Sequence, residues 1–261
     1  MKINLTGKVF CAIIIASTVE RRSEMIKYVF FDLDGTLLPM DQDLFIKIYF
    51  KDLSAVFARK GYDPKAFYDS LMRSIDLMIN NSSDMTNEEV FWKCLCEDLG
   101  AGVVDMNDDI DEFYHGDFLN ARKACSCNPL VKQAVDTLKA KGKRLMVATN
   151  PVFPAIASET RMQWGGVYPE DFEYITTYSN SKRCKPNIEY YLFLAEKFGC
   201  DPNECLMVGN DVSDDMPARD AGWKVFLVTD CLINRKNVDL SVYPNGDWKD
   251  LLSYVEKNDI L

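Results

Sequence analysis

Segment 28–37 constrains the fold of this chain more than any other. Its first residues, Tyr28–Phe31, are aromatic and β-branched, and this apolar run is too short for a helix, which predicts a buried β-strand. Asp32 and Asp34 follow, two positions apart, so both point to the same side of an extended chain, and Gly35 permits a sharp turn towards a ligand. Because burying a carboxylate is costly, we expect a divalent cation and a phosphate here; the alternative is a solvated Asp-Gly turn.

Four further short segments have the composition of buried strands, at residues 144–148, 174–177, 205–208 and 224–228. Segments with helical periodicity separate them. Strands that alternate with helices form parallel sheets covered by helices on both faces. We therefore predict an α/β fold in which segment 28–31 belongs to the same sheet.

Residues 41–119 contain helical patterns only. An apolar stripe recurs at helical spacing from residue 44 to residue 57, and the last of four helices is predicted from about residue 108 to residue 119. The capping signals between them are Asp63 before Pro64, the capping box of Thr86 with Glu89, and the terminating Gly100. We expect an all-α module at residues 39–126, inserted into an α/β core made of residues 25–38 and 127–261.

Composition limits the partners and the metal chemistry. A net charge of −10 excludes a broad basic surface, so we expect no nucleic-acid partner. The nine cysteines are odd in number and irregularly spaced, which indicates a reducing compartment, and we expect a cytoplasmic protein. Cys94 and Cys96 lie in a helical pattern with their thiols about 200° apart, which argues against zinc. The single histidine, His115, excludes multi-histidine metal sites.

The first 24 residues differ in composition from the strand and helix patterns that follow them. Lysines precede an apolar stretch at residues 9–19, which is similar to a signal peptide. This stretch is too short to span a bilayer and no clean cleavage site follows it, so we expect no stable membrane span. We interpret residues 1–24 as a non-native extension, with Met25 as the functional start and export as the alternative.

Polar residues also follow other predicted strands. Thr149 follows segment 144–148, Lys185 precedes Pro186 at the predicted start of a helix, and Asp211 follows segment 205–208. In this order the motifs resemble those of the haloacid dehalogenase superfamily: an Asp-x-Asp, a threonine or serine, a distant lysine and a later acidic pair. The resemblance covers residues 25 to about 230. It implies a Rossmann-like core with a helical cap between the first and second motifs.

The resemblance also implies roles for the first motif. Asp32 would be the nucleophile that forms an aspartyl-phosphate, and Asp34 would be the general acid and then the general base. Asp32, Asp211 and the backbone carbonyl of Asp34 would bind Mg²⁺, which takes few carboxylates and retains waters.

The remaining motifs would support this centre. Thr149, the backbone N–H of Asn150, and Lys185 would hold the oxygens of the transferring phosphate. Asp215 would face the site from behind the metal ligands, with Asp214 as the competing choice.

Asp34 separates the reaction classes, because dehalogenases of the superfamily lack an aspartate there and phosphatases and phosphomutases have it. The resemblance thus implies a Mg²⁺-dependent phosphatase acting on a small phosphorylated metabolite that fits beneath the cap. A phosphomutase, and a non-catalytic phosphate-binding protein on the same fold, remain the alternatives.

Overall fold

The alternating segments form a six-stranded parallel sheet with the order β3-β2-β1-β4-β5-β6 in the computed structural model, which describes residues 25–259. The strands are β1 (Tyr28–Phe31), β2 (Arg144–Val147), β3 (Tyr174–Ile175), β4 (Cys205–Gly209), β5 (Lys224–Val228) and β6 (Asn245–Gly246). The predicted α/β fold is confirmed. Strand β6 was not predicted, because two residues carry no periodicity, and the predicted strand at 174–177 is limited to the two residues of β3.

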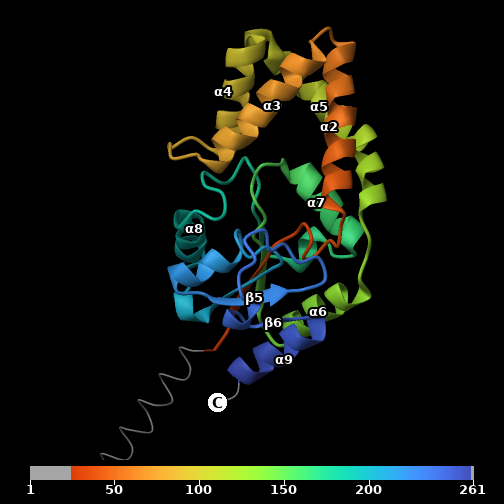
Figure 1. Cartoon of the computed structure of the whole chain (residues 1–261). Helices are drawn as coiled ribbons and strands as arrows, with labels where there is room; N and C mark the ends of the chain where they lie inside the picture. Colours follow the sequence, from red (N-terminus) through yellow and green to blue (C-terminus); the bar gives the residue numbers. More distant parts are fainter. Residues whose placement is uncertain (1–24, 260–261) are drawn as a thin grey trace, which may run out of the picture.

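Helices cover both faces of the sheet (Figure 1). Alternate residues of β1 point to opposite faces, so that Val29 and Phe31 belong to one apolar core and Phe30 to another. The first core includes residues of α6 (Pro129–Ala140), α7 (Ala155–Gly165) and α9 (Trp248–Asp259), and the second includes residues of α8 (Ile188–Phe198).

Residues 42–124, the first part of the chain between β1 and β2, are helical and lie above the sheet in Figure 1, drawn in orange to yellow-green. It contains α2 (Gln42–Arg59), α3 (Pro64–Ile79), α4 (Asn87–Leu99), η1 (Ala101–Met106), α5 (Asn107–His115) and η2 (Asp117–Ala124). The predicted caps of α3 and α4 are confirmed: Asp63 accepts from the N–H of Ala66, and Thr86 with Glu89 forms a capping box. The predicted helix 108–119 was wrong at its end, because α5 stops before Gly116 and the short 3-10 helix η2 follows.

Shorter 3-10 helices occur in the remaining core, at η3 (Pro169–Asp171), η4 (Pro202–Glu204), η5 (Met216–Ala221) and η6 (Leu240–Val242). Within residues 25–259, no helix is long and apolar enough to cross a membrane. The signal-like stretch at 9–19 lies outside the described residues.

The register of the sheet places three motifs at one edge. Phe31 pairs with Val147 on one side and with Val208 on the other. The residues that follow these three positions therefore emerge together at the carboxyl ends of β2, β1 and β4. The strand order also reverses at β1, and such a reversal opens a crevice for ligands in α/β sheets.

Candidate active site

Asp32 lies at the centre of a buried charge network. Its Oδ1 accepts a hydrogen bond from Lys185 Nζ at 2.7 Å, and Nζ also donates to Asp215 Oδ1 at 2.6 Å. Lys185 is only 2% exposed. Burial alone would lower the pKa of Lys185, but the charges of Asp215 and Asp32 raise it well above its usual value. The ammonium is therefore held charged between two carboxylates, 153 residues away from Asp32 in the chain.

Asp34 has a different partner. Its Oδ2 pairs with Nη1 of Arg161 at 2.5 Å, and the Arg161 side chain is fully buried. Asp34 Oδ1 is buried and has no hydrogen-bond partner among the described residues. Burial raises the pKa of Asp34 above its usual value, and the nearby Arg161 opposes this effect without cancelling it. A carboxyl group with one free, desolvated oxygen and a raised pKa is suited to carry a proton.

The loop after β4 holds Asp211 and Asp215 through its backbone. Asp215 Oδ2 accepts from the N–H of Asp211 at 2.9 Å, and Asp211 Oδ1 accepts from the N–H of Ser213 at 2.7 Å. Burial raises the pKa of Asp215 above its usual value, against the lowering effect of Lys185. A Cβ at Gly209 would lie 2.1 Å from the Asp215 carboxylate, so only glycine leaves room for this carboxylate. Asp215, and not the competing Asp214, contacts Lys185.

Asn150 joins two loops of the site. Its side-chain oxygen accepts from the N–H of Lys185 at 2.8 Å, and its Nδ2 donates to Asp214 Oδ2 at 3.2 Å. The preceding Thr149 is buried, and its carbonyl accepts from Tyr190 Oη at 2.9 Å. These bonds occupy the Asn150 side chain, and its carbonyl accepts from the N–H of Val152, so the predicted phosphate contact falls to the backbone N–H of Asn150.

Thr36 and Asn210 brace the turn after Asp34. Thr36 Oγ1 lies 2.9 Å from Asn210 Oδ1 and 3.3 Å from Asp32 Oδ2. Because the Thr36 hydroxyl has one proton, it donates to the nearer Asn210 Oδ1, and Asp32 Oδ2 is left with only a weak contact. Gly35 has φ +88°, and a Cβ there would lie 2.2 Å from Asn210 Nδ2, so this turn requires glycine.

These residues line one cavity of about 180 Å³. All of the predicted site residues belong to its lining, namely Asp32, Asp34, Thr149, Asn150, Lys185, Asp211, Asp214 and Asp215. Six further lining residues were not predicted, namely Gln42, Val152, Phe153, Asn210, Ile233 and Arg235. Among them, Arg235 comes from the loop after β5.

The chemistry of the donors suits a small hard cation. Among residues 25–259, no group of three or more His, Cys, Asp or Glu side chains is arranged to hold a metal. Mg²⁺ needs no such cage, since it binds through one or two carboxylates and retains waters. Asp32 and Asp211 supply two carboxylates in the same cavity. Arg235 Nη1 pairs with Asp211 Oδ2 at 2.8 Å, and because the Arg235 side chain is 65% exposed, it can leave that oxygen to a cation.

Two features of the site differ from the sequence analysis. Lys185 does not start a helix, because α8 begins at Ile188 with Asn187 as its N-cap, and Lys185 precedes a cis bond to Pro186. Arg161, which holds Asp34, was missed, because an arginine in a helical pattern normally indicates a solvated face.

Comparisons with known proteins agree with this geometry. A family model described as haloacid dehalogenase-like hydrolase matches residues 26–222. A phosphoglycolate phosphatase of Vibrio vulnificus is 28% identical over 207 residues, which cover 78% of this chain and 84% of the relative. Pyrophosphatase PpaX of Bacillus velezensis is 29% identical over 94 residues, 36% of this chain, and the match spans only 42% of its length.

The fold is also similar to solved structures. A 2-haloacid dehalogenase from Pseudomonas syringae gives a TM-score of 0.59 at 20% identity, covering 89% of this chain and 99% of that one. A HAD phosphatase from Thermococcus onnurineus gives 0.52 at 17% identity, covering 90% and 100%. At these identities the likeness concerns the fold alone. Because the family model covers most of the chain and the strand-end residues meet in one cavity, the chain belongs to the haloacid dehalogenase-like hydrolases.

Proposed function

We propose that this chain is a Mg²⁺-dependent phosphatase that hydrolyses a small phosphate monoester through a phosphorylated Asp32. The observation that carries the proposal is the pairing of two unlike carboxylates at the end of β1. Asp32 is held by the cation of Lys185, whereas Asp34 is desolvated and has a raised pKa. A nucleophile and an acid need these opposite environments.

In the first step Asp32 attacks phosphorus. Lys185 engages Oδ1, so the weakly engaged Oδ2 is the oxygen that forms the new bond. As the bond between phosphorus and the ester oxygen breaks, the proton on Asp34 moves to that oxygen and an alcohol leaves. Lys185 and the N–H groups after β2 stabilise the negative charge on the phosphoryl oxygens.

In the second step Asp34, now ionised, removes a proton from water. The water oxygen attacks phosphorus, the bond to Asp32 breaks, and inorganic phosphate leaves. Arg161 supports this half of the reaction, since its charge stabilises the ionised form of Asp34. One aspartate therefore acts first as acid and then as base.

Asp32, Asp211 and the carbonyl of Asp34 would hold the Mg²⁺. When bound, the cation neutralises charge between the phosphate and the carboxylates. Asp215 would position Lys185 and the backbone of Asp211, to both of which it is hydrogen-bonded.

The relatives support water as the acceptor of the phosphoryl group, because those reported above include enzymes named phosphoglycolate phosphatase and pyrophosphatase. The proposal includes the domain division: residues 39–126 form a cap over the site, and residues 25–38 and 127–261 form the catalytic core. We also propose a cytoplasmic location, because all eight cysteines in residues 25–259 are free thiols.

Phosphate release from an aryl phosphate tests the proposal. We expect turnover that stops with EDTA and returns with Mg²⁺, and that falls to background in Asp32→Asn while the circular dichroism spectrum is unchanged. Turnover by Asp32→Asn at the wild-type rate would refute the nucleophile. Transfer of the phosphoryl group back to a sugar, without release of phosphate, would instead indicate the phosphomutase alternative.

A further inference from the structure

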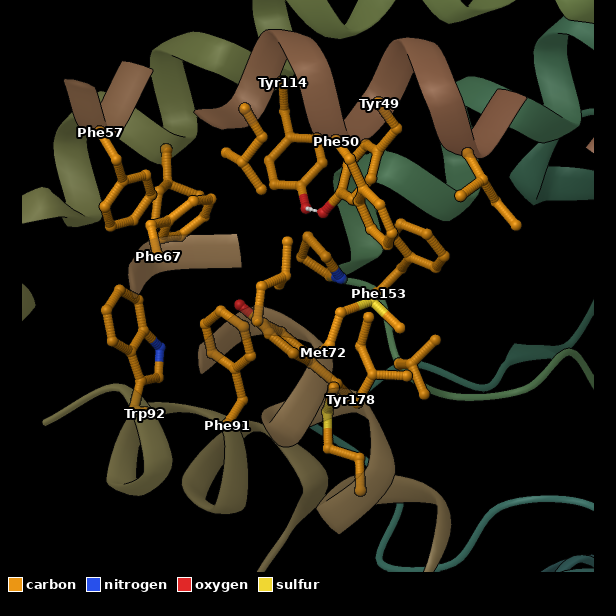
Figure 2. A pocket seen from close by; sticks show the side chains of 18 of the residues that line it. Tyr49, Phe50, Phe57, Phe67, Met72, Phe91, Trp92, Tyr114, Phe153 and Tyr178 are labelled. Carbon is orange, nitrogen blue, oxygen red and sulfur yellow. Dashed lines mark hydrogen bonds between the residues drawn. The ribbon is translucent and has the colours of Figure 1, made fainter. Parts of the chain in front are cut away.

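A second cavity lies in the helical module, next to the catalytic cavity. Its volume is about 280 Å³, against about 180 Å³ for the catalytic one. Figure 2 shows aromatic side chains from α2, α3, α4 and α5 surrounding one space, with Tyr49, Phe67, Phe91 and Tyr114 among those labelled.

The lining of this second cavity is apolar. None of the residues that line it is Asp, Glu, Lys, Arg or His. Tyr49, Tyr114 and Tyr178 contribute hydroxyl groups, and those of Tyr49 and Tyr114 lie 3.0 Å apart and hydrogen-bond each other. Burial raises the pKa of Tyr49 to about 12, so the hydroxyl stays neutral near pH 7. A charged group placed in this cavity would have no ionic partner among the lining residues and would lose its hydration.

Phe153 connects the two cavities, since it belongs to the lining of both. Its ring centre lies 5.3 Å from that of Tyr49 on the side of the helical module. The Arg161 guanidinium lies 4.2 Å from the same ring centre and pairs with Asp34. The apolar cavity therefore adjoins the acid of the proposed reaction, which is the group that meets the leaving oxygen.

We infer that the substrate is the phosphate monoester of an uncharged alkyl or aryl alcohol, whose apolar group occupies the cavity lined by Phe153 and the aromatic residues of α2 and α4. This inference rests on the proposed function. An apolar cavity of about 150 Å³ accommodates one benzene molecule, so this cavity takes a group larger than one ring. A short acid such as glycolate would leave the space unfilled and its carboxylate unpaired.

A chain-length series tests the inference. Each buried methylene contributes about 0.8 kcal/mol, which is about fourfold in binding, so kcat/KM for hexyl phosphate should exceed that for ethyl phosphate by up to about two hundredfold. Equal kcat/KM values for the two esters would overturn the inference and leave the proposed function standing. Release of phosphate from none of the esters would instead refute the proposed function.

Two variants of α3 provide a matched pair. Met72 lines the cavity and is 40% exposed, whereas Leu77 is 38% exposed and does not line it. We expect Met72→Trp to lower kcat/KM for hexyl phosphate at least tenfold and to change that for ethyl phosphate less than twofold. Leu77→Trp should change neither. A loss that is equal for both esters, or equal in both variants, would contradict the assignment of the cavity.

A binding measurement needs no turnover. Hexylphosphonate and ethylphosphonate keep the phosphorus group but have no ester bond to cleave. Isothermal titration of the wild-type protein with each, in the presence of Mg²⁺, should show tighter binding of hexylphosphonate by the same factor as the kinetic series. Equal affinities would overturn the inference.

Discussion

Replacement of Arg161 by methionine tests the acid role of Asp34. The guanidinium of Arg161 pairs with Asp34 Oδ2 at 2.5 Å and is fully buried. This positive charge stabilises the carboxylate and so lowers the pKa of Asp34, while burial raises it. Methionine retains much of the apolar volume without the charge, so that the pKa of Asp34 should rise further in Arg161→Met.

The size of the effect follows from the geometry. Two unit charges about 4 Å apart interact by about 4 kcal/mol at an effective dielectric constant of about 20, and about 1.4 kcal/mol corresponds to one pH unit. Reorganisation around Asp34 reduces this value, so we expect a shift of about one to three pH units. The kcat/KM profile reports the free enzyme, in which Asp34 must be protonated to donate. Its alkaline limb should therefore move to higher pH.

The assay is phosphate release measured across pH for the wild type, Arg161→Met and Arg161→Lys. The substrate phosphate titrates in the same way in both assays, so its effect cancels in the ratio of variant to wild-type kcat/KM at each pH. Arg161→Lys keeps the charge and should retain most of the wild-type profile. An alkaline limb that stays in place in Arg161→Met, with the protein folded by circular dichroism, would refute the acid role of Asp34.

Two further substitutions probe the loops after β4 and β5. Gly209→Ala should lower kcat by at least tenfold in the phosphate-release assay, because the added Cβ would displace the Asp215 carboxylate. Gly102→Ala is the control and should have no effect, because its Cβ would meet nothing within 4 Å. Equal kcat values for the two variants would refute the role of Gly209. Arg235→Ala should lower the Mg²⁺ concentration for half-maximal rate by up to about fivefold, since exposed ion pairs contribute about 0 to 1 kcal/mol. Lys236→Ala in the same loop is the control, and an unchanged Mg²⁺ requirement in Arg235→Ala would refute competition for Asp211.

The sequence predicts the part of the site that follows strands. Asp32 and Thr149 come directly after an apolar run and Asp211 follows three residues after one, and a parallel sheet aligns such run ends at one edge. The register between Phe31 and its two neighbours then brings the motifs together. The choice between Asp214 and Asp215 required the structure, because both are adjacent in the sequence and only the loop conformation decides which one reaches Lys185.

The remaining features depend on how separate elements pack. Arg161 lies in α7, where its spacing resembles that of a solvated arginine, and only the approach of α7 to the end of β1 buries it. The apolar stripe at residues 44–57 predicts a buried face of α2, and Tyr49 on this stripe is buried, but the same stripe also lines a cavity. The packing of four helices decides whether this apolar face closes against its neighbours or leaves a space, and the periodicity along one helix carries no information about that packing.

The proposed mechanism depends on Asp32 carrying the phosphoryl group during turnover. Rapid acid quenching of the wild-type enzyme with hexyl phosphate and Mg²⁺, followed by peptide mass spectrometry, tests it directly. We expect the added mass of one phosphoryl group on the peptide that contains Asp32, and no such mass in Asp32→Asn. Steady phosphate release with no added mass on that peptide at any quench time, or with the phosphoryl group on another residue, would refute Asp32 as the nucleophile.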